Sequence, residues 1–432
     1  MEPGVSHNMG AMRAIGAARA RVAVLSLHTS PLDQPGTGDS GGMNVYVRAL
    51  SERLAERGVA LDVFTRCSGR GVPEVEEVGP LVRVIQIQAG PCAPVVKDDL
   101  PSLLPDFARG VMGAGEGRYD LVHAHYWLSG WAGRAVKRGW DVPLVASFHT
   151  LGRVKNLADA HDPEPPRRLG GEHGVVRAAD LILAPTPAEA AQLTDLYGAR
   201  ADRIRVVPPG VDLGRFRPRP AEEAKKRLGL SGRPVVLFVG RLQRLKGPDV
   251  AIRAFGEATR ARPDLVGEAA LVLVGGPSGP GSGSRVERLR RLAHRAGIAD
   301  RVRFLPPVPH ADLGSLYAAA DVVVMPSRSE SFGLVALEAQ AGGIPVIASA
   351  VGGLRYVVAD GESGFLVQPG DHRALADRLL RLLGHPGLRA RLSAAAVRHA
   401  SRFSWERTAD LVHAVYGELV PDLAERGALA GA

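Results

Sequence analysis

The sequence alternates short apolar runs with helical patterns, and it repeats this alternation in two successive halves. The first half has apolar runs at 21–27, 61–65, 82–88, 121–124, 144–148 and 181–184, and the second half has them at 235–239, 271–274, 302–305, 322–325 and 345–348. Strands that alternate with helices are typical of βαβ units, whose parallel sheets are covered by helices. The sequence therefore predicts an α/β protein with two doubly wound sheets, each forming a Rossmann-like domain.

A strong break separates the two halves. Pro208, Pro209 and Gly210 follow the first set of runs and interrupt any regular element. The length of 432 residues also exceeds the size at which a single core stops growing. We expect a flexible arm over residues 1–20, a first domain over 21–208, a second domain over 209–403 and a final segment over 404–432. Within that segment, a helix over 405–416 is expected to pack back on the first domain, with a frayed tail beyond residue 424.

Composition narrows the class of protein. Hydrophobic residues make up 45% of the chain and charged residues 23%, which is near the average for globular proteins. No apolar run approaches the roughly 18 residues that span a bilayer, and the N-terminal residues lack the apolar core of a secretory signal. Cys67 and Cys92 lack CxxC spacing, which argues against a disulfide scaffold or a zinc site. These features predict a protein of the reducing cytoplasm with no membrane partner.

The chain is basic, with a formal net charge of +9, but its 54 basic residues are spread along the whole sequence. A nucleic-acid-binding protein usually gathers such charge into a patch, so no nucleic-acid partner is expected. The lysines are few: Lys97, Lys137, Lys155, Lys225, Lys226 and Lys246. A lysine in so arginine-rich a chain can mark a geometric requirement, and the context of Lys97 and Lys246 makes them candidates.

Three loops that follow predicted strands carry unusual residues. Ligands of parallel α/β sheets bind at the carboxyl ends of the strands. The first loop, HTSPLDQPGTGDSGGMN over 28–44, contains four glycines and leads into a helix, so its backbone N–H groups suit an anion. It matches neither GxGxxG nor the P-loop spacing, and a glycine-rich loop can also be a simple turn.

The other two loops lie in the second half. The segment GRLQRLKG places Arg241 and Lys246 after a strand, where two cations would neutralise a diphosphate leaving group, although basic residues there are often merely solvated. The segment ESFGLVALE begins a helix near residue 332, and its first N–H groups suit phosphate oxygens. Glu330 could meet a sugar hydroxyl or simply cap the helix, and Glu338 could accept hydrogen bonds from ribose hydroxyls.

Together these loops resemble glycosyltransferase family 4. The resemblance covers roughly residues 21–404. It implies a GT-B fold, in which two Rossmann-like domains face each other across a cleft, and transfer with retention of anomeric configuration. The segments HTSPLDQPGTGDSGGMNVYV, HAHYWLSG and SFHTLGRVKN resemble members that transfer N-acetylglucosamine from UDP-N-acetylglucosamine to 1D-myo-inositol 3-phosphate, the first step of mycothiol biosynthesis.

The resemblance also implies roles for individual residues. The implied donor contacts are His28, Gln34, Pro35, Gly42, Arg241, Lys246, Val308, Glu330 and Glu338. The implied acceptor contacts are Asp39, Ser40, Gly41, Gly42, Met43, Asn44, Lys97, Tyr126, Thr150 and Arg167. Arg168 competes with Arg167 for the last position. Because the donor contacts come from both domains, hinge closure is expected.

The implied mechanism uses no enzymatic nucleophile. These loops fix no carboxylate near the anomeric carbon, as a double displacement would require. Members of the family are thought to react on one face of the sugar, with the UDP oxygen taking the acceptor proton while the enzyme stabilises charge. The expected catalytic residues are Arg241, Lys246, Glu330 and His149, although a histidine at a strand end is often structural. No DxD-type acidic pair is present, so no cofactor is required for catalysis. The sequence leaves two questions open: whether a magnesium ion binds near the second-domain loops, with ligands unknown, and whether the protein forms a homodimer.

Two other readings remain open. Another member of the family, such as a relative of sucrose-phosphate synthase, would share the basic acceptor site and differ in the acceptor loop. A non-catalytic nucleotide-sugar sensor would share the fold, because fold alone does not determine function. The combination of Arg241, Lys246, Glu330 and Glu338 favours an enzyme over a sensor.

Overall fold

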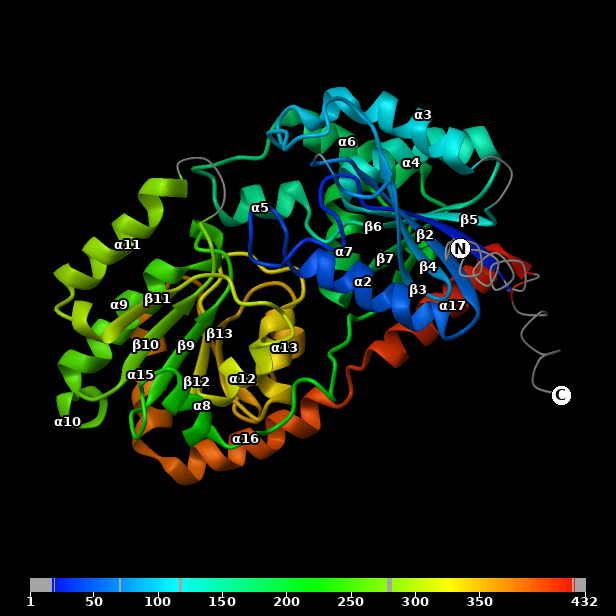
Figure 1. Cartoon of the computed structure of the whole chain (residues 1–432). Coiled ribbons are helices and arrows are strands. Elements are labelled where there is room, and N and C mark those ends of the chain that lie inside the picture. The colour runs from blue at the N-terminus through cyan, green and yellow to red at the C-terminus, as the bar shows by residue number, and fades with distance from the viewer. Residues whose placement is uncertain are drawn as a thin grey trace, which may run out of the picture.

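The computed structural model describes residues 18, 20–69, 71–115, 119–277, 282–421 and 423. These residues form two lobes, each built on one sheet flanked by helices (Figure 1). We call them the first lobe and the second lobe. The expected arm over 1–20 and the tail beyond 424 fall almost entirely outside the described residues.

The first lobe contains an eight-stranded sheet with the order β3-β4-β2-β1-β5-β6-β7-β8. Its strands are β1 (Ala20–Leu25), β2 (Val59–Arg66), β3 (Val75–Gly79), β4 (Val82–Ile87), β5 (Leu121–His125), β6 (Leu144–Ser147), β7 (Leu181–Ala184) and β8 (Ile204–Val206). Every neighbouring pair is parallel except β3 and β4. β3 was not predicted from the sequence, because this edge strand is exposed and lacks an apolar run.

The second lobe contains a six-stranded parallel sheet with the order β11-β10-β9-β12-β13-β14. Its strands are β9 (Val235–Val239), β10 (Ala270–Val274), β11 (Val302–Leu305), β12 (Val322–Met325), β13 (Val346–Ser349) and β14 (Gly364–Val367). β14 was not predicted from the sequence; it begins with a glycine and has only four residues.

Helices cover both faces of each sheet. In the first lobe they are α2 (Gly42–Ala55), α3 (Leu104–Gly115), α4 (Tyr126–Trp140), α5 (Gly152–Ala158), α6 (Pro166–Ala178) and α7 (Pro187–Tyr197). In the second lobe they are α8 (Ala221–Arg227), α9 (Pro248–Ala261), α10 (Pro263–Val266), α11 (Ser282–Arg295), α12 (Leu313–Ala318), α13 (Leu334–Ala341), α14 (Leu354–Val357), α15 (His372–Gly384) and α16 (Pro386–Ala400). Among the helices of the described residues, none combines the length and the apolarity needed to cross a bilayer.

The side chains of β1 alternate between two cores. Val22 and Val24 pack in a cluster with residues of α2 and the C-terminal helix, whereas Ala23 and Leu25 pack in a cluster with residues of α3 and α4. All of them are at most 2% exposed. Successive side chains point to opposite faces of the sheet, and both faces are buried. The strand is therefore a continuous apolar run in the sequence.

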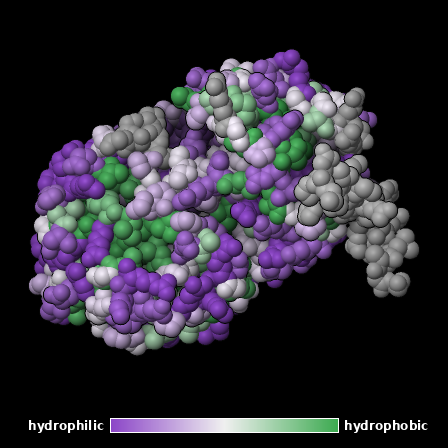
Figure 2. Space-filling view, viewed as in Figure 1, coloured by the Kyte–Doolittle hydropathy of each residue, from purple (hydrophilic) through white to green (hydrophobic). Residues whose placement is uncertain are grey.

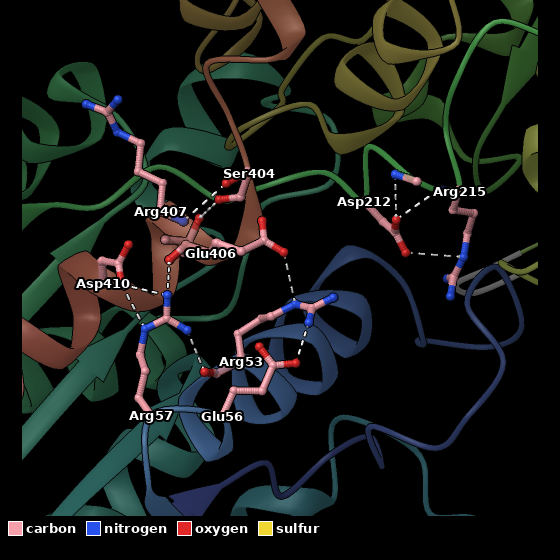
Figure 3. Close-up of polar contacts among 11 residues, drawn as sticks. Arg53, Glu56, Arg57, Asp212, Arg215, Ser404, Glu406, Arg407 and Asp410 are labelled. Carbon is pink, nitrogen blue, oxygen red and sulfur yellow. Dashed lines mark hydrogen bonds and ion pairs between the residues drawn. The ribbon is translucent and has the colours of Figure 1, made fainter. Parts of the chain in front are cut away.

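The last helix, α17 (Trp405–Leu419), returns from the second lobe and lies along α2 of the first lobe (Figure 1). Its apolar residues join the core of the first lobe. Ion pairs connect the polar sides of the two helices, from Arg53 to Glu406 at 3.3 Å and from Arg57 to Asp410 at 2.6 Å (Figure 3). The chain therefore crosses between the lobes twice, once after β8 and once before α17.

The lack of CxxC spacing argued against a disulfide scaffold, but the structure contains a disulfide. Cys67 and Cys92 form a disulfide, with their α-carbons 4.9 Å apart. Cys67 directly follows β2, and its N–H donates to the carbonyl of Ile87 at the end of β4. Because β2 and β4 are parallel neighbours, the segments that leave them emerge at one edge of the sheet. The argument from cysteine usage to a reducing compartment therefore fails.

Candidate active site

A cavity of about 1450 Å³ lies between the lobes, at the carboxyl ends of both sheets. The strand order reverses between β1 and β5 and between β9 and β12, and open α/β sheets bind ligands at such points. The loops after β1, β6, β9 and β12 all contribute to the cavity wall. In the view of Figure 2, hydrophilic residues gather along the edges of both lobes, and hydrophobic residues form a patch on the face of the second lobe. The cavity is large enough for two small-molecule substrates.

The loop after β1 is fixed by Asn44, which is 2% exposed. Its side-chain oxygen accepts from the N–H of Gly41 at 2.9 Å, and its amide donates to the carbonyl of Ser30. Gly42 approaches the second lobe, since a Cβ there would lie 3.3 Å from Leu334. Of the residues expected in this loop, Asp39, Gly41, Gly42 and Met43 line the cavity, whereas Ser40 and Asn44 are buried outside its wall.

Gln34, an expected donor contact, instead connects the first lobe to the second. The Gln34 amide donates to the carbonyl of Pro307 in the second lobe, at 3.3 Å. Val308 follows directly and packs against the core of the second lobe. Gln34, Pro35 and Val308 are not part of the cavity wall.

The acceptor side is organised around Tyr126, which begins α4 with a positive φ of 73°. Lys97 and Arg168 each carry their charge 5.1 Å from the centre of its ring, within cation–π range. The Tyr126 hydroxyl is buried without a hydrogen-bond partner among the described residues. The His28 ring also lies 4.5 Å from that of Tyr126. An unused hydroxyl beside two cations suits an anionic ligand with hydroxyl groups.

Arg168, rather than Arg167, lies with the expected acceptor residues. Its guanidinium donates to the Thr150 hydroxyl at 3.0 Å and to the buried Glu172 carboxylate at 2.8 Å, and it is 2% exposed. The Arg167 side chain is 50% exposed and donates to the carbonyl of Asp98. Both arginines line the cavity. The sequence could not decide between these adjacent arginines, because the rotation of α6 about its axis determines which of them faces Thr150.

Lys155 adds a third cation that the sequence analysis did not select. It lies on α5, lines the cavity and pairs with Glu164. Glu164 also pairs with Arg168 at 2.8 Å, so one carboxylate connects two cations. Burial, followed by the charges of Arg168, Lys97 and Arg241, lowers the pKa of Lys155 to about 7, whereas the charge of Asp162 raises it. A bound anion would favour the charged form further.

Three histidines form a cluster beneath the cavity. His149 has a positive φ of 60°, lines the cavity, and its Nε2 lies 2.9 Å from the Nδ1 of His125. His123 bonds to the Tyr416 hydroxyl of α17 at 2.8 Å. Burial lowers the pKa of His149 to about 3, and it lowers the pKa of His125 and of His28 well below the usual value. The rings are therefore neutral near pH 7, and His149 is a poor general base.

The donor side contains the two cations expected after β9. Arg241 lies 3.8 Å from the Asp39 carboxylate of the first lobe, and Lys246 lies 2.6 Å from the Glu330 carboxylate. All four side chains line the cavity. The structure thus brings together a cationic pair from the second lobe and the glycine-rich loop of the first lobe.

The helix expected at the third loop, α13, begins at Leu334, after Gly333 with a φ of 107°. Residues 329–335 line the cavity, so the N-terminal end of the helix faces it. Glu338 lies further along the helix, outside the cavity wall. Its carboxylate accepts from the Tyr317 hydroxyl at 2.8 Å and lies 2.7 Å from the His310 ring.

The described part of the chain holds no group of three or more His, Cys, Asp or Glu side chains arranged to bind a metal ion. Positive charge in the cavity is instead supplied by side chains from both lobes. These are Lys97, Lys155, Arg167, Arg168, Arg241, Arg244, Lys246 and Arg285. The arrangement suits two phosphorylated ligands, one facing each lobe.

Comparisons with known proteins identify the class. Residues 40–215 match the family described as Glycosyltransferase Family 4, and residues 220–399 match Glycosyl transferases group 1. Sucrose-phosphate synthase from Thermosynechococcus elongatus has a similar structure, with a TM-score of 0.86 and 35% identity over 93% of this chain and 99% of that chain. Anabaena HepE, solved in complex with UDP and glucose, has a TM-score of 0.74 at 23% identity, which shows the fold alone. The protein is a glycosyltransferase, and the expected GT-B fold is confirmed.

Sequence relatives narrow the family. The D-inositol 3-phosphate glycosyltransferase of Acidothermus cellulolyticus is 51% identical, over 94% of this chain and 91% of the relative. The protein of the same name from Thermomonospora curvata is 50% identical, over 92% of this chain and 95% of the relative. The chain belongs to glycosyltransferase family 4, and it is similar along nearly its whole length to these inositol phosphate enzymes.

Proposed function

We propose that this enzyme transfers N-acetylglucosamine from UDP-N-acetylglucosamine to 1D-myo-inositol 3-phosphate, with retention, and releases UDP. This reaction is the first step of mycothiol biosynthesis, and we propose a cytoplasmic location for it. One observation carries the proposal: Arg241 and Lys246 of the second lobe line the same cavity as a second cationic group, which consists of Lys97, Lys155 and Arg168 of the first lobe. A nucleotide diphosphate suits the first set, and a phosphate monoester suits the second. The name shared by the relatives supports the inositol phosphate acceptor.

In the proposed reaction, the bond from the anomeric carbon to the UDP oxygen breaks as the acceptor hydroxyl approaches on the same face. The leaving UDP oxygen takes the hydroxyl proton, since the neutral His149 has little basicity. Arg241 and Lys246 stabilise the charge that develops on the diphosphate. Glu330, which is paired with Lys246 at 2.6 Å, would turn to a sugar hydroxyl when a donor binds.

The test is to incubate the purified protein with UDP-N-acetylglucosamine and one candidate acceptor at a time, and to measure UDP release. The acceptors are myo-inositol, 1D-myo-inositol 3-phosphate, fructose 6-phosphate and none. Release that requires inositol phosphate supports both the donor and the acceptor. Absence of release with inositol phosphate, while UDP-N-acetylglucosamine binds, contradicts the proposal and favours a nucleotide-sugar sensor.

A second candidate acceptor is fructose 6-phosphate. The likeness to sucrose-phosphate synthase over almost the whole of both chains favours it. Its phosphate would meet the same cations, so only the contacts to its hydroxyl groups would differ. Release with fructose 6-phosphate and UDP-glucose, and not with inositol phosphate, would select this second function.

We further propose that the transfer needs no metal ion, because Arg241 and Lys246 already face the expected diphosphate position. Turnover in EDTA is expected to stay within about twofold of turnover with added MgCl₂. A loss of more than tenfold in EDTA, reversed by magnesium, would contradict this.

A further inference from the structure

Arg244 belongs to the same short turn as Lys246, a 3₁₀ turn over Arg244–Lys246. The turn is fixed within the second lobe by Arg328, whose guanidinium donates to the Arg244 carbonyl at 2.6 Å. Arg328 is itself held by two hydrogen bonds to the Asp249 carboxylate, at 3.0 and 2.8 Å. The position of Arg244 is therefore rigidly related to that of Lys246.

The Arg244 side chain reaches the first lobe. Its Nε donates to Asp159 at 2.7 Å. Asp159 ends α5, where its N–H donates to the Lys155 carbonyl at 2.9 Å, and its second carboxylate oxygen accepts from the N–H of His161 at 3.2 Å. The position of Asp159 is therefore tied to Lys155, one of the acceptor-side cations.

Two other polar contacts connect the lobes, and both differ from the Asp159–Arg244 pair. Arg241 lies 3.8 Å from Asp39, but both residues are expected at substrates, so bound ligands would separate them. The Gln34 amide donates to the Pro307 carbonyl at 3.3 Å, but neither residue is part of the cavity wall. The pair of Asp159 and Arg244 is short, oppositely charged and expected at neither substrate, so it can persist while the cavity is occupied.

We propose that Asp159 and Arg244 are positioning residues, which hold the donor-side cations at a set distance from the acceptor-side cations when the lobes close. The inference rests on the proposed function, because it assigns the two sides of the cavity to donor and acceptor. Asp159 is 5% exposed, and the Arg244 side chain is 55% exposed. If the lobes opened, water would solvate the Asp159 carboxylate and the Arg244 guanidinium. The ion pair therefore forms only when the lobes close, and it stabilises the closed arrangement modestly.

The test is a double-mutant cycle of Asp159→Asn, Arg244→Gln and the double variant. We expect each single variant to lower kcat about three- to tenfold, the range for a charge-assisted pair with one exposed partner. The double variant is expected to be no worse than the more damaged single variant, because the two residues act as one unit. The KM for either substrate should change less than kcat, since both residues line the cavity but neither is among the expected substrate contacts.

Matched controls are Asp202→Asn in the first lobe and Arg262→Gln in the second. Each removes one charge from an exposed ion pair that is not part of the cavity wall, and each is expected to leave kcat within about twofold. Losses in the two single variants that multiply in the double variant would overturn the proposal. So would single variants with the turnover of the controls.

A second measurement does not depend on transfer. Small-angle X-ray scattering in the presence of UDP should give a larger mean radius of gyration for both single variants than for the unmodified enzyme. Equal radii would overturn the closure role. If the unmodified enzyme released no UDP with inositol phosphate, the proposed function would fail, and the scattering result would still decide whether this pair favours closure.

Discussion

At the scale of single residues, the donor cations are already matched with carboxylates. Lys246 pairs with Glu330 at 2.6 Å, and Arg241 lies 3.8 Å from Asp39. A diphosphate carries more charge than one carboxylate, so it can displace these partners and take both cations. The carboxylates that are released would then be free to bind hydroxyl groups of the sugar or the acceptor.

Removal of either donor cation should therefore act on the chemical step. Arg241→Ala and Lys246→Ala are each expected to lower turnover by about a hundredfold or more, because charge on the leaving diphosphate develops mainly in the transition state. Steady-state UDP release measures this, with Arg262→Ala as an exposed control. A variant of either cation with near-normal turnover would show that the leaving group is stabilised elsewhere.

Arg168 and Arg167 give a sharper test of the acceptor side. Arg168→Lys keeps the charge but loses the fork that contacts Thr150 and Glu172, so the KM for inositol phosphate should rise about tenfold or more. Arg167→Ala removes an exposed side chain and should raise the same KM less than about threefold. The lysine variant avoids leaving Glu172 as an unpaired buried charge. The reverse order of effects would return the acceptor role to Arg167.

At the scale of secondary structure, the disulfide joins two segments that leave neighbouring strands. Cys92 precedes Lys97 in the same loop, and the Arg66 guanidinium donates to the carbonyls of Pro91 and Ala93, both at 2.8 Å. The disulfide and Arg66 therefore anchor the start of the segment that presents Lys97 to the cavity.

Reduction of this disulfide should destabilise the protein. The cysteines are 25 residues apart, and closure of such a loop in the unfolded chain corresponds to about 3.5 kcal/mol. Urea unfolding with and without dithiothreitol measures the difference in the free energy of unfolding. Cys67→Ser cannot form the bond. Its free energy of unfolding should therefore be the same with and without dithiothreitol, and close to that of the reduced unmodified protein. A midpoint unaffected by dithiothreitol in the unmodified protein would contradict the prediction.

The same scale shows what sequence patterns can and cannot reveal. The bounds of buried strands such as β7 and β9 were predicted to the residue. A strand of a parallel sheet is buried on both faces, so it appears in the sequence as a continuous apolar run. The exposed edge strand β3 carries no such run. The disulfide required knowledge that β2 and β4 are neighbours, and strand order is not encoded in the spacing of two cysteines.

At the scale of the whole molecule, the candidate site depends on how the lobes face each other. The loops that contain Arg241 and Glu330 were found because they follow predicted strands. Contacts between lobes, such as Gln34 with Pro307 or Asp159 with Arg244, have partners far apart in sequence. Only their placement in space reveals them, and a single sequence does not specify it.

The two segments that cross between the lobes, after β8 and before α17, contact each other, and these contacts fix how the lobes are oriented. Val211 donates to the Phe403 carbonyl at 3.1 Å, and the Thr408 hydroxyl donates to the Pro208 carbonyl at 2.8 Å. Gly210 lies between these contacts. A Cβ at Gly210 would lie only 2.3 Å from the backbone nitrogen of Trp405, so this close approach requires glycine.

Gly210→Ala should therefore disturb both stability and lobe arrangement. The added methyl group must push one backbone segment away from the other, at a cost of about 1–3 kcal/mol in the free energy of unfolding. Because the same segments connect the lobes, turnover should also fall while UDP still binds the second lobe. Gly214→Ala is the matched control, since a Cβ there meets only the Asp212 carboxylate at 3.4 Å. Thermal unfolding, UDP binding and UDP release measure the three effects. If Gly210→Ala matches Gly214→Ala in all three, the crossing segments tolerate separation, and the lobe arrangement must be set by contacts across the cavity instead.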